Sequence, residues 1–178
     1  MPIETKEVKM KPERKEVLVD FEGTSKEAEA KILIQEDSYK GEIIGVDLIS
    51  VPAYEQPKGA KETLMENKVV FQIKLSGEGS DNAVLSMYAN PVIKKSSGTK
   101  GYSNSKLFDL LEMAGELEEA KSQWEALETL KGLVGFLSAR LVGRNVKALV
   151  KTRNKGTENA YSGIGSVVRF EAKPQGVQ

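Results

Sequence analysis

Two runs of alternating side chains, at residues 145–151 and 160–170, flank a polar loop near the end of the chain. The loop, residues 152–159, contains Gly and Asn, which accept the backbone conformations of tight turns. The pattern therefore predicts a β-hairpin, and alternation gives it two different faces. The expected core face carries Val146, Ala148, Val150, Ile164, Val168 and Phe170. The expected outer face is nearly all cationic or aromatic: Arg144, Lys147, Lys151, Arg153, Lys155, Tyr161 and Arg169.

Three further strands are predicted upstream, at residues 40–51, 68–75 and 83–89. Gly45 lies inside the first of them, and a glycine inside a strand is typical of a bulge or a sharp bend. The other two alternate between apolar and polar side chains, which is typical of strands with one buried face. Their expected core positions are Val69, Phe71, Ile73, Leu75, Leu85 and Met87.

A helical insert is predicted between the third and fourth strands, at about residues 103–141. Its first helix is capped by Ser103 or Ser105 and ends at Gly115. A second helix is expected over residues 117–131, closed by Gly132, and a short third one over 133–141. Trp124 lies on the apolar stripe of the second helix, so we expect it to dock the insert onto the sheet.

The two ends of the chain have the composition of flexible segments. Residues 1–16 mix Lys and Glu with two prolines and cannot bury enough apolar surface to offset the entropy of ordering. A short edge strand is expected at residues 17–21, and residues 171–178 are expected to fray. We therefore predict one domain over residues 17–170, mainly β with an α insert.

The chain has no Cys and no His. Disulfides, thiol nucleophiles, Cys/His zinc sites and an imidazole base are thereby excluded. The glycine pairs, such as Gly163 and Gly165, do not open a helix after a strand, so they predict bends and turns and not a phosphate-binding loop. We expect no catalytic residues, no metal and no cofactor, and therefore not an enzyme.

With no signal-type leader and no long apolar run, we also expect a cytoplasmic protein without a membrane span.

Charge is segregated along the chain, although the formal net charge is zero. Residues 140–178 hold eight basic and two acidic side chains, whereas residues 103–130 hold two basic and seven acidic ones. The sequence therefore predicts a basic hairpin beside an acidic insert.

Three strands, a helix and a closing hairpin follow one another in the order of the OB-fold, a five-stranded β-barrel that binds oligonucleotides. The pattern from Ser105 to Gly115, the segment 141–150 and the aromatic strand at Tyr161 resemble small replication-type proteins of phages and archaea. The resemblance covers about residues 41–170. It implies an OB-like five-stranded barrel, with a helical insert between strands 3 and 4, that binds single-stranded DNA. The acidic insert and the segment before residue 41 depart from that pattern.

Binding a single strand requires cations for the phosphates and flat side chains on which bases stack. The residues with these properties are predicted to form the binding site: Lys94, Lys95, Lys100, Tyr102, Arg144, Lys147, Lys151, Arg153, Lys155, Tyr161 and Tyr88. The sequence does not distinguish DNA from RNA, and we expect little sequence preference.

Other interpretations of the same charges stay open. The lysines are also typical of side chains that protect an edge strand from aggregation. The glutamates of the insert fit the polar face of amphipathic helices, or a docking site for a protein partner. The alternative function is a structural or assembly protein of a virus or phage, in which the basic hairpin of one copy contacts the acidic insert of the next in a homo-oligomer.

Overall fold

The computed structural model describes residues 32–59, 61–98 and 103–172. The predicted arm at residues 1–16, the strand at 17–21 and most of the tail at 171–178 lie outside the described residues. The described chain divides into two compact units. The smaller comprises residues 32–33 and 154–161, and the larger comprises residues 34–153 and 162–172.

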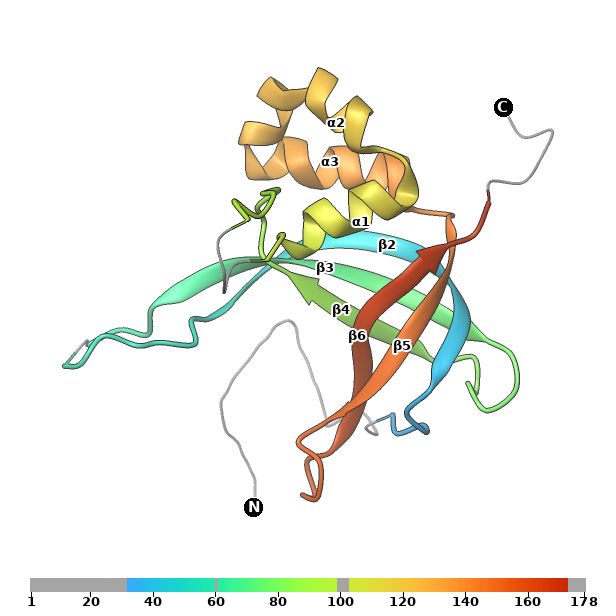
Figure 1. The fold of residues 1–178 in the computed structure, drawn as a ribbon. Coiled ribbons are helices and arrows are strands. Elements are labelled where there is room, and N and C mark those ends of the chain that lie inside the picture. Colours follow the sequence, from blue (N-terminus) through green and yellow to red (C-terminus); the bar gives the residue numbers. More distant parts are fainter. Residues whose placement is uncertain (1–31, 60, 99–102, 173–178) are drawn as a thin grey trace, which may run out of the picture. The chain divides into compact units, whose positions relative to one another are not determined.

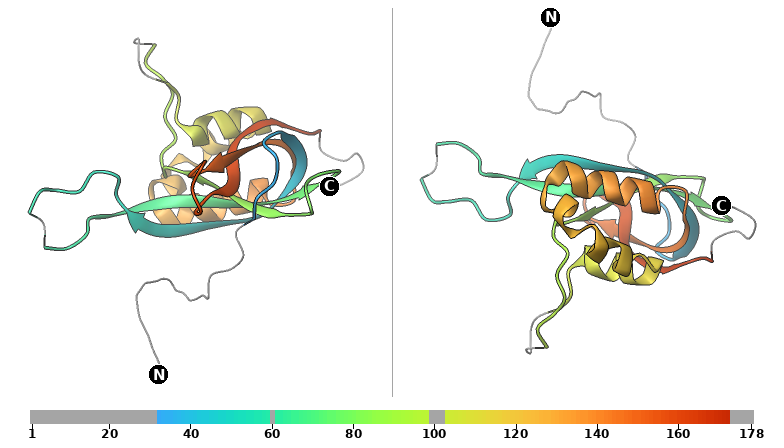
Figure 2. Two further views of the ribbon diagram at one scale, coloured as in Figure 1. Left: turned by 90° about the horizontal axis from the view of Figure 1, so that it is seen from below. Right: turned by 90° about the horizontal axis from the view of Figure 1, so that it is seen from above.

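Five strands form one open antiparallel sheet in the order β4-β3-β2-β5-β6 (Figure 1). Their bounds are β2 Ser38–Pro52, β3 Met65–Ser76, β4 Val84–Ala89, β5 Asn145–Arg153 and β6 Tyr161–Phe170. All five strands predicted over residues 40–170 are therefore confirmed, and so is the mainly β class with a helical insert. In the larger unit, residues 53–59 and 61–64 and the segment 90–98 project from the sheet (Figure 2).

The long strand β2 is the centre of the sheet. It pairs with β3 from Lys40↔Ser76 to Pro52↔Met65, and its first residues pair with β5 from Ser38↔Leu149 to Glu42↔Asn145. The register with β3 shifts between Ile43 and Gly45, so Ile44 is an extra residue in the ladder. The predicted bulge at Gly45 is confirmed, and a bulge bends its strand and increases the local twist.

The predicted core positions of β3, β4 and β5 are all buried, including Phe71, which is completely enclosed. The prediction fails in β6, where Val168 is 48% exposed and its neighbour Val167 is buried. Ile164 and Val167 are three positions apart and both reach the core, so regular alternation does not hold across Gly165 and Ser166. Phe170 packs at the edge of the core, as expected.

Helix α1 (Lys106–Ala114) has the predicted caps. The Ser105 hydroxyl accepts a hydrogen bond from the Phe108 N–H, and Gly115 adopts the left-handed conformation with φ 75°. The single helix predicted over 117–131 is wrong, because this segment forms α2 (Leu117–Ser122) and the 3-10 turn η1 (Trp124–Glu128) before α3 (Leu130–Leu141) begins. None of the helices in the described part of the chain is long and apolar enough to cross a membrane.

Gly132 does not end a helix but lies in the first turn of α3. The Thr129 hydroxyl caps that helix by accepting from the Gly132 N–H at 3.0 Å. A Cβ atom at residue 132 would lie 1.8 Å from the carbonyl oxygen of Ala126. Glycine is therefore required where η1 folds back onto the start of α3.

Replacing Gly132 with Ala is expected to destabilise the protein, because the new methyl group overlaps backbone that cannot move aside easily. We expect the free energy of unfolding, measured by urea denaturation, to fall by about 2 kcal/mol, as in other overpacked sites. Gly135→Ala in the same helix is the matched control, since an added Cβ there has no neighbour within 4 Å. It should be neutral or stabilising by up to about 1 kcal/mol. Equal effects of the two changes would contradict the role assigned to Gly132.

Candidate nucleic-acid interface

The outer face of β5 is basic, as predicted. Val146, Ala148 and Val150 are fully buried, whereas the alternate positions include Lys147, which is half-buried, and the exposed Lys151 and Arg153. The alternation that gives the sheet its core thus directs these cations to the opposite face.

Two glycines of β6 make room for these cations. A Cβ atom on Gly165 would lie 2.7 Å from Cγ of Lys151, and one on Gly163 would lie 3.7 Å from Nε of Arg153. Both glycines lie inside the strand, so the prediction of a turn at this place is wrong. Their physical role is a close approach, because the stems of two basic side chains lie against the β6 backbone.

Gly163 also marks the place where the two edge strands of the sheet come close. The same added Cβ would lie 3.7 Å from the carbonyl oxygen of Ser86 in β4. The curvature of the sheet therefore brings Arg153, at the end of β5, near β4, although two strands of the ladder lie between β5 and β4.

Two lysines that the sequence interpretation did not select lie beside Tyr88 of β4. Lys106, the first residue of α1, donates from Nζ to the Tyr88 carbonyl oxygen at 3.0 Å. Lys68 of β3 donates to the Asn90 side chain and pairs with Glu66 at 3.4 Å. Both lysines and the 47% exposed Tyr88 line a pocket of about 250 Å³ that is completed by Ala89, Asn90, Val92 and Ser105.

The electrostatics of this pocket favour an anion. Burial lowers the pKa of Lys106 below its usual value, and the positive charges of Arg153 and Lys68 lower it further. The repulsion between these positive charges is reduced when a negative group binds between them. We call Tyr88, Lys68, Lys106 and Arg153 the Tyr88 cluster.

The remaining predicted contacts are distributed over other segments. Lys94 and Lys95 are exposed in the segment before α1, where the Lys94 N–H donates to the Ser105 hydroxyl at 2.9 Å. Lys155 and Tyr161 belong to the smaller unit, whose loop is closed by a bond from the Thr157 N–H to the Asn154 carbonyl oxygen at 3.2 Å. Lys100 and Tyr102 lie outside the described residues.

Arg144 has a different role from the one predicted. Its guanidinium group lies 3.7 Å from a carboxylate oxygen of Glu116, donates to the Ala114 carbonyl oxygen and stacks over the ring of Phe170 at 5.1 Å. It is largely enclosed by these partners and joins the end of α1 to β6. Arg144 is therefore a structural cation and not an exposed contact for a phosphate.

Glu116, which the sequence places on a polar helix face, is 3% exposed. It accepts from Nε of Arg140 at 2.9 Å, and Arg140 also pairs with Glu119 at 3.5 Å. The Gln123 amide and, after it, the Arg140 guanidinium lower the pKa of Glu119. Arg140 and Arg144 were two of the basic residues that define the predicted charge segregation, so part of that segregation is neutralised within the larger unit.

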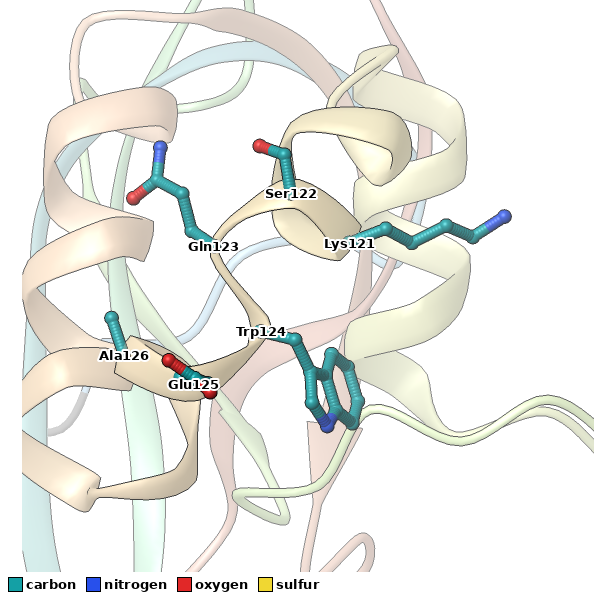
Figure 3. Close-up of a pocket in the computed structure, with 6 residues that line it drawn as sticks. All are labelled: Lys121, Ser122, Gln123, Trp124, Glu125 and Ala126. Carbon is teal, nitrogen blue, oxygen red and sulfur yellow. The ribbon is translucent and has the colours of Figure 1, made fainter.

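Trp124 does not dock the insert. It is 46% exposed, and Figure 3 shows its indole pointing away from α3 beside a shallow pocket of about 400 Å³. The buried contacts of this part of the insert come instead from Ala120 and Leu127. The stripe that predicted a buried tryptophan is interrupted where α2 ends and η1 begins.

Removing the buried carboxylate of Glu116 is expected to destabilise the protein. Glu116→Gln leaves Arg140 and Arg144 without their shared anion, and we expect a loss of roughly 2–3 kcal/mol in the free energy of unfolding. This is less than the loss for a fully enclosed pair, because Arg140 is partly exposed to water. Glu118→Gln on the exposed side of α2 is the control and should change stability by no more than about 0.5 kcal/mol. An unchanged denaturation midpoint for Glu116→Gln would refute the account.

Within the described residues, no group of three or more acidic side chains is placed to hold a metal ion. Comparisons with models of protein families, with curated proteins and with solved structures found no match.

Proposed function

We propose that this chain binds single-stranded DNA or RNA on an OB-like β-barrel, with the Tyr88 cluster at the centre of the binding face. The observation that carries the proposal is the convergence of Lys68, Lys106 and Arg153, from three separate elements, beside an exposed tyrosine. Cations beside an exposed aromatic ring are the two components that a single strand requires.

The order of the strands supports the proposed barrel. An OB-fold barrel uses five strands with a helix between the third and the fourth, and it is often only partly closed. The order β4-β3-β2-β5-β6 matches such a barrel opened between β4 and β6, the edges that approach each other at Ser86 and Gly163. The second and third strands of the fold are its usual ligand face, and here these are β3 and β4.

The side chains on that face suit unpaired bases better than a duplex. Tyr88 lies opposite Val70 in the β3–β4 ladder, and its 47% exposed side chain is accessible to a base. Stacking of one base on an aromatic side chain contributes about 1–3 kcal/mol, and it is available only when the base is not paired inside a helix. A phosphate beside the ring would at the same time offset the repulsion that Arg153 and Lys68 exert on Lys106.

The basic row on β5 extends the proposed path of the strand. Lys151 lies two residues before Arg153 on the same face, and Lys147 lies four residues before Lys151. We propose these two as phosphate contacts, together with the exposed Lys94 and Lys95. Lys100, Tyr102, Lys155 and Tyr161 remain proposed contacts on the grounds of their chemistry.

A second candidate function is a protein contact through the insert, either with a partner or with another copy of the chain. The exposed Trp124 favours it, because a large aromatic side chain that is about half exposed to solvent is typical of a binding surface. The acidic side of such a contact would use Glu125, Glu128 and Glu118, whose ion-pair partner Lys121 is itself exposed, because Glu116 and Glu119 are paired with Arg140.

Removing two cations of the Tyr88 cluster should weaken nucleic-acid binding and its dependence on salt. We expect Lys106→Gln with Arg153→Gln to reduce the slope of log affinity against log salt by about 1.4, because each phosphate contact to a single strand contributes about 0.7. Fluorescence anisotropy with a labelled oligonucleotide of about 30 nucleotides measures both quantities.

The matched control is Lys121→Gln with Lys131→Gln, which removes the same charge from the insert and should leave the slope nearly unchanged. The fluorescence of Trp124, the only tryptophan, shows in the same titration whether the insert takes part in binding. Its emission should stay constant if the oligonucleotide binds at the Tyr88 cluster. A failure of the unmodified chain to bind at low salt would exclude the proposed function, and equal losses in the two double variants would exclude the proposed site.

A further inference from the structure

We infer that a second pocket, which is also lined by Lys106, recognises a single guanine base of the bound strand. The inference rests on the proposed function, because it assigns a preferred nucleotide to the same binding face. The pocket lies in the larger unit between the first helix of the insert and β6, and it has a volume of about 290 Å³. That volume is close to the lower limit of small-molecule sites, about 300 Å³, and is suited to one base.

One face of α1 supplies most of the lining. Lys106, Asp109, Leu110 and Met113 are spaced i, i+3, i+4 and i+7, so they project from the same side of the helix. The strand β6 adds Ser166 and Val167. The pocket therefore combines a polar end near the start of α1 with apolar side chains further along the helix.

The apolar side chains form a surface on which a flat ring can lie. Leu110 and Val167 are buried and belong to the walls, whereas Met113 is partly exposed at the rim. The thioether of methionine is polarisable and adaptable, and it contacts aromatic rings favourably. An aromatic base is thus a better occupant than a phosphate for this part of the pocket.

The polar end is organised by hydrogen bonds. The Ser96 N–H donates to Oδ1 of Asn104 at 2.7 Å, and Nδ2 of Asn104 donates to Oδ1 of Asp109 at 2.9 Å. Asn104 thus fixes the orientation of the Asp109 carboxylate. Among the described residues, Oδ2 of Asp109 has no bonded partner, so it remains an acceptor for a ligand.

Lys106 supplies the complementary donor. An ammonium group has three N–H donors, and the bond to the Tyr88 carbonyl oxygen uses one of them. Lys106 lines both pockets, so it links this site to the Tyr88 cluster. A strand whose phosphate lies at the cluster can therefore place a neighbouring base in the second pocket.

Guanine is the base whose edge matches a lysine and a carboxylate three residues apart on a helix. Its pairing edge presents one acceptor, O6, followed by two donors, the N1–H and the 2-amino group. Adenine and cytosine lack the adjacent pair of donors, and thymine has a single donor between two acceptors. The assignment is therefore O6 to Lys106 and the two donors to the carboxylate of Asp109.

The test compares oligothymidylates of about 15 nucleotides that carry one central thymine, guanine, hypoxanthine or adenine, titrated into the full chain by anisotropy. We expect the oligonucleotide with one guanine to bind at least about five-fold more tightly than the all-thymine one. A factor of about five is the lower end of the discrimination that a good bidentate contact to a base provides. Hypoxanthine lacks the 2-amino group and should lose most of that gain. Asp109→Asn should abolish the preference, whereas Glu125→Gln, which removes one exposed carboxylate from the insert, should retain it.

The outcomes separate the two proposals. Binding of all four oligonucleotides within two-fold of one another in the unmodified chain would overturn the guanine site and leave the proposed function intact. A guanine preference that survives in Asp109→Asn would also overturn it. If no oligonucleotide binds at low salt, the proposed function fails and the guanine site fails with it.

Discussion

The pairing of β2 with two different strands is the constraint on which the rest of the sheet depends. One end of β2 is shared between β3 and β5, and the extra residue Ile44 bends the strand just beyond the shared part. This curvature accounts for the approach of β4 and β6 at Ser86 and Gly163, two edges that a flat sheet would hold far apart. Without it, Arg153 in β5 would lie three strand positions away from Tyr88 in β4.

The chain uses its basic residues in two physically different ways. Arg140 and Arg144 share the buried carboxylate of Glu116. Arg140 thereby holds α3 against the start of α2, and Arg144 joins the end of α1 to Phe170 of β6. Lys106 and Arg153 instead lie near each other and near Lys68, so their charges repel and lower the pKa of Lys106. Neutralised cations stabilise a fold, whereas cations held together against their repulsion are suited to binding an anion, which is the basis of the proposed function.

The sequence predicts those parts of the fold that depend on local pattern. Alternation locates the five strands, Gly45 marks the bulge, and Ser105 and Gly115 delimit α1. It fails where tertiary contacts decide. Nothing local distinguishes Arg144 from Arg153, because the difference is made by Glu116 and Phe170, which come from distant segments. Trp124 is exposed because α2 ends at Ser122 and the 3-10 turn η1 begins at Trp124, which interrupts the stripe.

The Tyr88 cluster was only partly predictable for the same reason. Tyr88 and Arg153 follow from alternation, but Lys68 and Lys106 join them only through the curvature of the sheet and the position of α1. Each lysine has a local signal, since Lys68 lies on the polar side of β3 and Lys106 directly follows the cap of α1. Neither signal indicates that the two side chains meet.

The central claim is that one surface, around Tyr88, binds the single strand. Backbone amide NMR of the full chain, titrated with an oligothymidylate of about 15 nucleotides, tests it most directly. The account predicts that the largest shift changes fall on Tyr88, Lys106 and Arg153, with the segment from α2 to η1 unaffected. Shift changes confined to that segment of the insert, around Trp124, would contradict it.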